Sequence, residues 1–273
     1  MKSVGLFGTC RVSCLNGEGL SLLRKTKSNT TASKVGLIYQ DDLAVYEGQP
    51  FNYTTKLQDA IDAIKYLKGS LFDGTISSAN YDKTFFSLFC RGYSPVCFDR
   101  KECSEPKSWK GYDLIVVEVN SLRKILIKTE RFGKKYLGAN LPWNVFLEKQ
   151  HQILEWSSDD FEIIEPTQSS VDNMLAELLT LIDSPLLIVG PYLLPETPSS
   201  RKLFGEDDHI PVYKINERRG MVRNFLLNSS SRNLFSYFDM TEHIKRSPAL
   251  LKNQYHFSEI GERILYERIK SML

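Results

Sequence analysis

The stretch DLIVVEV, residues 113–119, is the clearest buried strand in this chain and decides its fold class. Its apolar residues are mostly β-branched and run almost without a break, which is typical of a strand covered on both faces. Strands of this kind occur in parallel sheets, because the crossover connections place helices on both sides. Working outward along the chain, shorter apolar runs predict four more strands, at residues 3–8, 35–39, 185–194 and 233–241.

Amphipathic helices are predicted between and after these strands. Thr55-Lys-Leu-Gln58 has the spacing of a capping box, and apolar residues follow it at helical intervals. Three more helices are predicted, at residues 171–183, 214–227 and 258–272. In the last of them, Ile260, Ile264 and Leu265 are expected to face the core.

Strands that alternate with helices predict an α/β fold. We expect one three-layer, doubly wound, flavodoxin-like domain over residues 1–273, with a parallel five-stranded sheet. Two stretches do not follow the alternation: about 70–110, rich in aromatic residues and cysteine, and about 124–165, lysine-rich at first. We expect both to be insertions near the carboxyl edge of the sheet, where ligands bind in open α/β folds. Each forms either a wall of a ligand pocket or a surface elaboration without function.

The composition limits the classes of function. Among 273 residues, 35 basic and 33 acidic side chains give a net charge of +2, which argues against a general nucleic-acid binder. No apolar run reaches the ~18 residues of a membrane span. The N-terminus has no convincing secretory signal, so a cytoplasmic protein is expected. The five cysteines, at positions 10, 14, 90, 97 and 103, include no CxxC pair, so we expect free thiols and no metal site.

Three short motifs stand at strand ends or before the last helix. Gly8-Thr9-Cys10-Arg11 follows the first strand, Glu118-Val119-Asn120-Ser121 ends the third, and Asn253-Gln254-Tyr255-His256 precedes the final helix. Their order and positions resemble the SGNH (GDSL-like) hydrolase family. That family carries a Gly-Asp-Ser nucleophile block after strand one, a Gly-x-Asn-Asp block after strand three and an Asp-x-x-His block near the C-terminus.

This chain differs from the family pattern at informative positions. Cys10 stands where the nucleophilic serine would stand, which is similar to the GSCFA family and to the WcbI-type capsular polysaccharide biosynthesis proteins. Asn253 replaces the usual aspartate of the third block. Around Asn120, the glycine and aspartate of the family are replaced by Glu118 and Ser121.

The resemblance implies a Cys-His site. Cys10 would be the nucleophile, His256 the base and later the acid, and Asn253 the residue that orients the imidazole, as in Cys-His-Asn proteases. A cysteine at a helix N-terminus has a lowered pKa, so its thiolate needs less help from a carboxylate than a serine does. Asn120 and the backbone N–H of Cys10 would stabilise the oxyanion. The residues expected to contact the substrate are Arg11, Gly48, Glu118 and Ser121.

The resemblance therefore implies an acyl or acetyl transferase, or an esterase, that acts on a sugar or polysaccharide precursor. It requires no cofactor, and acyl-coenzyme A is the natural cytosolic co-substrate. The expected partners are small molecules or carbohydrates, not nucleic acid. The alternative is a non-catalytic binding protein on a degenerate SGNH hydrolase fold, because the same departures fit a site that has lost its activity.

Two further features leave alternatives open. Arg218, Arg219 and Arg223 form one basic helix face, which is either solvated or in contact with a phosphate or coenzyme A. Asp239 is either a turn residue at a strand end or a carboxylate that orients His256.

Overall fold

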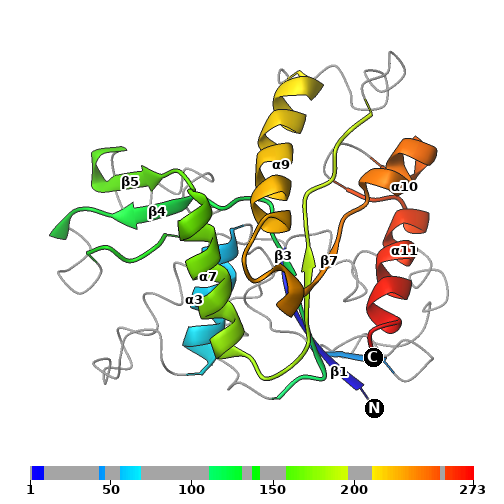
Figure 1. The fold of residues 1–273 in the computed structure, drawn as a ribbon, viewed down its shortest axis with the longest axis horizontal. Helices are drawn as coiled ribbons and strands as arrows, with labels where there is room; N and C mark the ends of the chain where they lie inside the picture. Colours follow the sequence, from blue (N-terminus) through cyan, green and yellow to red (C-terminus); the bar gives the residue numbers. More distant parts are fainter. Residues whose placement is uncertain are drawn as a thin grey trace, which may run out of the picture.

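A five-stranded sheet forms the centre of the protein. The computed structural model describes residues 2–8, 43–46, 56–68, 111–130, 137–141, 158–195, 211–252 and 256–273. Within these residues the strand order is β2-β1-β3-β6-β7, and every neighbouring pair is parallel (Figure 1). The strands are β1 (Lys2–Phe7), β2 (Leu43–Tyr46), β3 (Leu114–Glu118), β6 (Leu186–Val189) and β7 (Ser236–Phe238). The prediction of an α/β protein with a parallel sheet is confirmed.

Four of the five predicted strands overlap strands of this sheet. The strand predicted at 35–39 lies outside the described residues. On the side of β1 opposite to β3, the paired strand is β2. The run predicted at 185–194 is longer than β6, because Pro191 has no N–H to continue the ladder after Gly190. The strand predicted at 233–241 is shortened to β7, because residues 232–234 form a 3-10 turn, η6.

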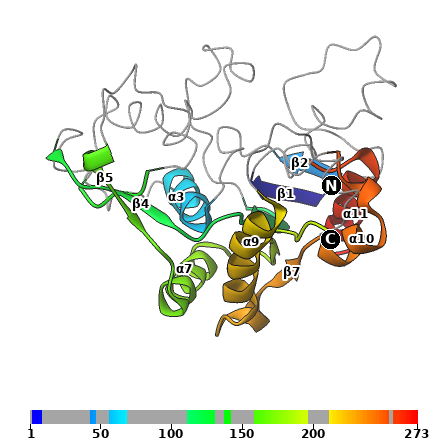
Figure 2. The same cartoon turned by 90° about the horizontal axis from the view of Figure 1, so that it is seen from above.

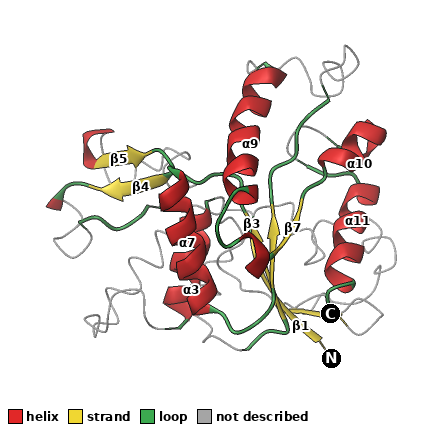
Figure 3. Ribbon diagram, in the orientation of Figure 1, coloured by secondary structure: helices red, strands yellow, loops and turns green. Residues whose placement is uncertain are grey.

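The α-helices among the described residues lie around the sheet (Figure 3). They are α3 (Leu57–Leu67), α7 (Gln168–Leu181), α9 (Val212–Leu227), α10 (Thr241–Arg246) and α11 (Glu259–Lys270). All but the short α10 match predicted helices. At the start of α7, Ser170 N donates to Thr167 Oγ1 over 3.2 Å, and Thr167 N donates to Ser170 Oγ over 2.9 Å. These reciprocal bonds satisfy backbone donors that a helix start otherwise leaves open.

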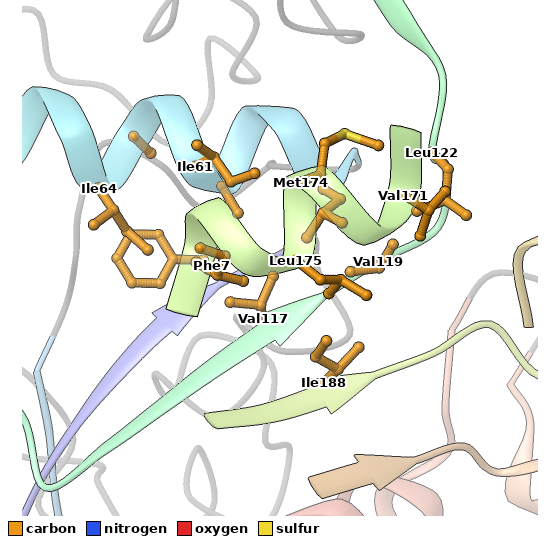
Figure 4. Close-up of a cluster of buried hydrophobic side chains, with 14 of the residues drawn as sticks. Phe7, Ile61, Ile64, Val117, Val119, Leu122, Val171, Met174, Leu175 and Ile188 are labelled. Atoms are coloured by element: carbon orange, nitrogen blue, oxygen red, sulfur yellow. The ribbon is translucent and has the colours of Figure 1, made fainter. Parts of the chain in front are cut away.

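Side chains alternate between the two faces of the sheet, and each face has its own apolar core. Ile115 and Val117 of β3 belong to a core that includes residues of α3 and α7, and Figure 4 shows this face. Leu114 and Val116 belong to a second core with residues of α10 and α11. Figure 2 shows the two groups of helices on opposite sides of β1. Because helices cover both faces, the near-continuous apolar run of β3 is buried throughout.

The buried stripe of α11 differs from the prediction in one residue. Gly261, Leu265 and Ile269 are buried at four-residue intervals. Ile260 was expected to face the core, but its side chain is 63% exposed. One helical residue corresponds to a rotation of about 100°, so the stripe that contains Leu265 turns Ile260 toward solvent.

A two-stranded antiparallel ribbon lies apart from the main sheet. It consists of β4 (Lys124–Ile127) and β5 (Phe161–Ile164), inside the stretch predicted as an insertion at 124–165. Ile125 and Ile127 of β4 join the same core as α3 and α7, and the ribbon extends beyond these two helices (Figure 1). The other predicted insertion, at 70–110, lies outside the described residues. Among the described helices, none combines the length and apolar content that a membrane span requires.

Candidate functional site

The carboxyl ends of the parallel strands meet along one edge of the sheet. Glu118 at the end of β3 lies beside Val189 at the end of β6, and Val189 lies beside Phe238 at the end of β7. Gly8 follows the last residue of β1 and is buried. In open α/β sheets this edge is the usual place for a ligand, so motifs that follow these strands belong to one neighbourhood.

Glu118 and Asn120 form a hydrogen-bonded pair at this edge. The Glu118 side chain is fully buried and follows Leu114 and Val116 on the face covered by α10 and α11. Asn120 Nδ2 donates to Glu118 Oε1 over 2.8 Å. A buried carboxylate requires donors of this kind. The bond fixes the orientation of the Asn120 amide and leaves its second N–H without a partner among the described residues.

Ser121 connects the loop after β3 to the start of α3. Leu57 N donates to Ser121 O over 3.1 Å, and Lys56 pairs with Ser121 in a parallel bridge. The Ser121 hydroxyl accepts from Arg123 N over 3.2 Å. Ser121 therefore stabilises the turn that leads into β4. These contacts leave its predicted role in substrate binding untested.

His256 lies between the 3-10 turn η7 (Pro248–Leu250) and α11 in the chain. Lys252 N donates to His256 O over 2.9 Å, and the His256 side chain is half-buried. The neighbouring Phe257 is buried on the α10 and α11 face, where its ring centroid lies 5.2 Å from that of Tyr192. Tyr192 follows β6 at the carboxyl edge. The loop of His256 and the Glu118 side chain thus share one face of the sheet.

Four predicted site residues lie outside the described residues: Cys10, Arg11, Gly48 and Asn253. Their roles stay predictions. Of the predicted residues that are described, the structure joins Glu118 to Asn120 and attaches Ser121 to α3.

Two of the three arginines on the basic face of α9, Arg219 and Arg223, contact the protein. Arg219 Nη1 donates to Tyr192 O over 3.1 Å, and the Arg219 guanidinium lies 4.6 Å above the Tyr192 ring. This cation–π contact joins α9 to the segment that leaves β6. Arg218, one residue earlier, is exposed. Sequence patterning placed these arginines together, but it did not predict the aromatic partner.

Asp239 acts as a turn residue at the end of β7, which was one of its two predicted roles. Its Oδ1 accepts from Thr241 N over 2.8 Å, two residues along the chain, as in an Asx turn. Its Oδ2 accepts from Arg223 Nε over 3.0 Å. Nearby, burial raises the pKa of the Tyr237 phenol, and the negative charge of Asp239 raises it further. Tyr237 therefore keeps its proton at neutral pH.

A second polar site, which the sequence did not reveal, lies between α3 and the ribbon. The fully buried Lys56 donates from Nζ to Asn140 Oδ1 over 2.8 Å and to Leu141 O over 2.6 Å, and forms an ion pair with Asp59 at 3.1 Å. Asn140 Nδ2 donates to Asp59 over 2.9 Å and to Asp62 over 3.1 Å. All three donors of the ammonium group are used. The only sequence signal is the spacing of Lys56 and Asp59, which is equally typical of a solvated helix face.

Comparison with known proteins finds no matching family model, curated protein or solved structure. Within the described ranges, no group of three or more His, Cys, Asp or Glu side chains has the arrangement of a metal site.

Proposed function

We propose that this protein is an acyl or acetyl transferase, or an esterase, that forms a thioester on Cys10. One observation carries the proposal: the hydrogen-bonded pair of Glu118 and Asn120 lies at the carboxyl edge of a parallel sheet, on the face that also holds the loop of His256. Cys10 follows Gly8 by two residues, so the covalent chain keeps their Cα atoms within about 8 Å. These positions support the proposal that the three motifs of the sequence meet at this edge of the sheet.

The finer fold is part of the proposal. We infer a doubly wound, flavodoxin-like sheet of the SGNH type. Numbered along the chain, the five parallel strands follow the order 2-1-3-4-5, which is the order of the flavodoxin-like class. Helices on both faces of the sheet also support this assignment.

The chemistry proceeds by two acyl transfers. The Cys10 thiolate attacks the carbonyl carbon of an acyl donor, and the collapsing oxyanion expels the donor's thiolate, which takes the proton held by His256. The hydroxyl of a sugar acceptor then attacks the thioester, His256 takes the hydroxyl proton, and Cys10 leaves as thiolate. Water in place of the acceptor gives hydrolysis. The second N–H of the Asn120 amide, which has no partner among the described residues, is the donor proposed for both oxyanions.

The substrate class follows from the resemblance to cysteine-bearing capsule biosynthesis proteins. We propose a sugar or polysaccharide precursor as the acceptor and acyl-coenzyme A as the donor, in the cytoplasm. No further cofactor is needed, because the thiol and the imidazole supply the nucleophile and the proton transfers.

Incubation with acyl-coenzyme A tests the proposal directly. We expect the intact mass of the protein to rise by one acyl group for at least one member of a series from acetyl to palmitoyl. Cys10→Ala should abolish this adduct, whereas Cys14→Ala should retain it, because Cys14 has no proposed role. Absence of an adduct across the whole series, together with unchanged activity in Cys10→Ala, would overturn the proposal.

A binding protein on the same fold is the second candidate, and one observation favours it. Glu118 stands where the family has glycine, and its carboxylate accepts from the amide that is proposed to bind an oxyanion. The carboxylate of the buried Glu118 would oppose the negative charge of an oxyanion bound to the same amide.

The reactivity of the thiol separates the two candidates. For the enzyme, we expect iodoacetamide to label Cys10 faster than the other four cysteines at pH ~6.5, where an unperturbed thiol is only about one per cent ionised. His256→Ala should slow this labelling, because it removes the imidazolium that stabilises the thiolate. Slow and equal labelling of all five cysteines, unchanged in His256→Ala, would favour the binding protein. Peptide mass spectrometry measures each rate.

A further inference from the structure

The buried polar site between α3 and the ribbon has more acceptors and more negative charge than its donors satisfy. We name it the Lys56 cluster, and its members, each at most 8% exposed, are Lys56, Gln58, Asp59, Asp62 and Asn140. We infer that the Lys56 cluster holds one exchangeable proton on Asp62, and that this proton controls how firmly the β4–β5 ribbon is attached to α3. The inference is independent of the proposed enzymatic function.

The charges of the cluster do not balance when both carboxylates are ionised. One ammonium group, on Lys56, faces two carboxylates, on Asp59 and Asp62, which leaves one excess negative charge. Lys56 contacts Asp59. Among the described residues, Asp62 accepts hydrogen bonds only from neutral amides: Gln58 Nε2 over 2.9 Å and Asn140 Nδ2 over 3.1 Å. A buried carboxylate with only neutral partners is costly, because desolvation is not offset by an opposite charge.

The other charged groups around Asp62 do not restore the balance. Lys65, on the same helix, favours the ionised carboxylate, but it forms an ion pair with Glu177 of α7. From the ribbon side, the cluster is closed by Asn140, which is neutral. The excess charge therefore stays on Asp62.

An unsatisfied acceptor lies on the same side chain that binds this carboxylate. Gln58 Nε2 donates to Asp62 Oδ1, whereas Gln58 Oε1 is buried and has no hydrogen-bond partner among the described residues. The hydrogen bonds of the cluster therefore do not compensate for its excess charge. A single proton on Asp62 removes that charge, because the carboxyl group is then neutral.

The pKa of Asp62 supports this assignment. The pKa of Asp62 is raised from 3.8 to about 6. Burial is the largest cause and the negative charge of Asp59 adds to it, against the lowering effects of Gln58, Asn140 and Lys65. Since the folded-state pKa lies above the unfolded value, the protonated cluster stabilises the folded state most below pH 3.8. This stabilisation is lost as the pH rises through about 6.

The cluster controls the ribbon through residues 137–141. Leu141 N donates to Ile125 O over 2.7 Å, and Ile127 N donates to Ala139 O over 3.0 Å, so this segment is paired with β4. Asn140, in the middle of the segment, binds both carboxylates of α3. An ionised carboxylate on Asp62 is costly while it is buried, and opening of this segment exposes it to water. Ionisation of Asp62 therefore weakens the attachment of the segment, and β4 opens with it.

Native-state hydrogen exchange of the Leu141 and Ile127 amides tests the inference. We expect their opening constants, corrected for intrinsic exchange, to rise about tenfold between pH 5 and pH 7.5, because opening exposes Asp62 at its ordinary pKa. Asp62→Asn should remove this pH dependence. Glu162→Gln, which changes an exposed carboxylate on β5, should retain it. Equal pH dependence in Asp62→Asn and the parent protein would overturn the inference.

A direct titration needs no variant and therefore decides the question even if Asp62→Asn does not fold. Carboxyl carbon NMR of the parent protein should give Asp62 an apparent pKa near 6. An apparent pKa of 4 or below would show that the cluster holds no proton in this range.

Discussion

A Lys56→Met protein is expected to unfold with a free energy about 3–5 kcal/mol below that of the parent protein. Methionine has a similar length but no charge, so Asp59 loses its ammonium partner while it stays buried. Asn140 Oδ1 and Leu141 O lose a donor in the same step. Equilibrium denaturation at pH 7, followed by circular dichroism, measures the difference.

Two further variants make this result specific to the buried charge. Lys245→Met removes an exposed ammonium group that pairs with Glu242 over 2.7 Å, and we expect a far smaller effect, because water replaces the lost partner. Lys56→Met combined with Asp59→Asn should recover part of the loss, because it removes a stranded carboxylate. A Lys56→Met protein as stable as Lys245→Met would contradict the buried ion pair.

Gly261→Ala is expected to destabilise the protein by roughly 1–3 kcal/mol. A Cβ at this position would lie 2.4 Å from the backbone oxygen of Leu250 and 3.0 Å from the Cβ of Phe257. This oxygen belongs to η7, against which α11 packs. The steric clash can therefore be relieved only if the backbone of α11 or η7 moves. Thermal or chemical unfolding of the variant measures the cost.

Gly220→Ala is the matched control within the described helices. Gly220 lies inside α9, and a Cβ there would meet no atom within 4 Å. Alanine is favoured over glycine in a helix by about 1 kcal/mol, so this variant should be more stable than the parent. The two alanine substitutions are thus expected to act in opposite directions. If both variants changed the free energy of unfolding in the same direction, α11 would not approach η7 as closely as described.

Much of the architecture could be predicted because it depends on neighbours in the sequence. The continuous apolar run at 113–119 predicted a doubly covered parallel strand, and β3 is buried throughout. Helical periodicity found α3, α7, α9 and α11. These patterns are local, because the two-residue period of a strand and the 3.6-residue period of a helix can be recognised within a short stretch of sequence. The side of a helix that faces the core was less predictable at the helix start, because the packing of α11 decides that Ile260 is exposed.

The composition of the candidate site stays a prediction, because Cys10 and Asn253 lie outside the described residues. Its local geometry could not be read from the sequence. The sequence treated Glu118 and Asn120 as separate residues, whereas the structure joins them by a hydrogen bond. The contact of Arg219 with Tyr192 depends on how α9 lies over the end of β6, which no local pattern records.

Apolar and helical patterns were enough to predict the parallel α/β class, the main helices and the position of Asn120 just after a strand. The burial of Lys56, Asp59 and Asp62, in contrast, depends on segments that are distant in the sequence. Charged side chains in an amphipathic helix normally face water, and Lys56 meets Asn140 from 84 residues away. The physical reason is that desolvation depends on every atom packed around a charge. The ribbon that buries the Lys56 cluster therefore decides its electrostatics, and the local sequence does not.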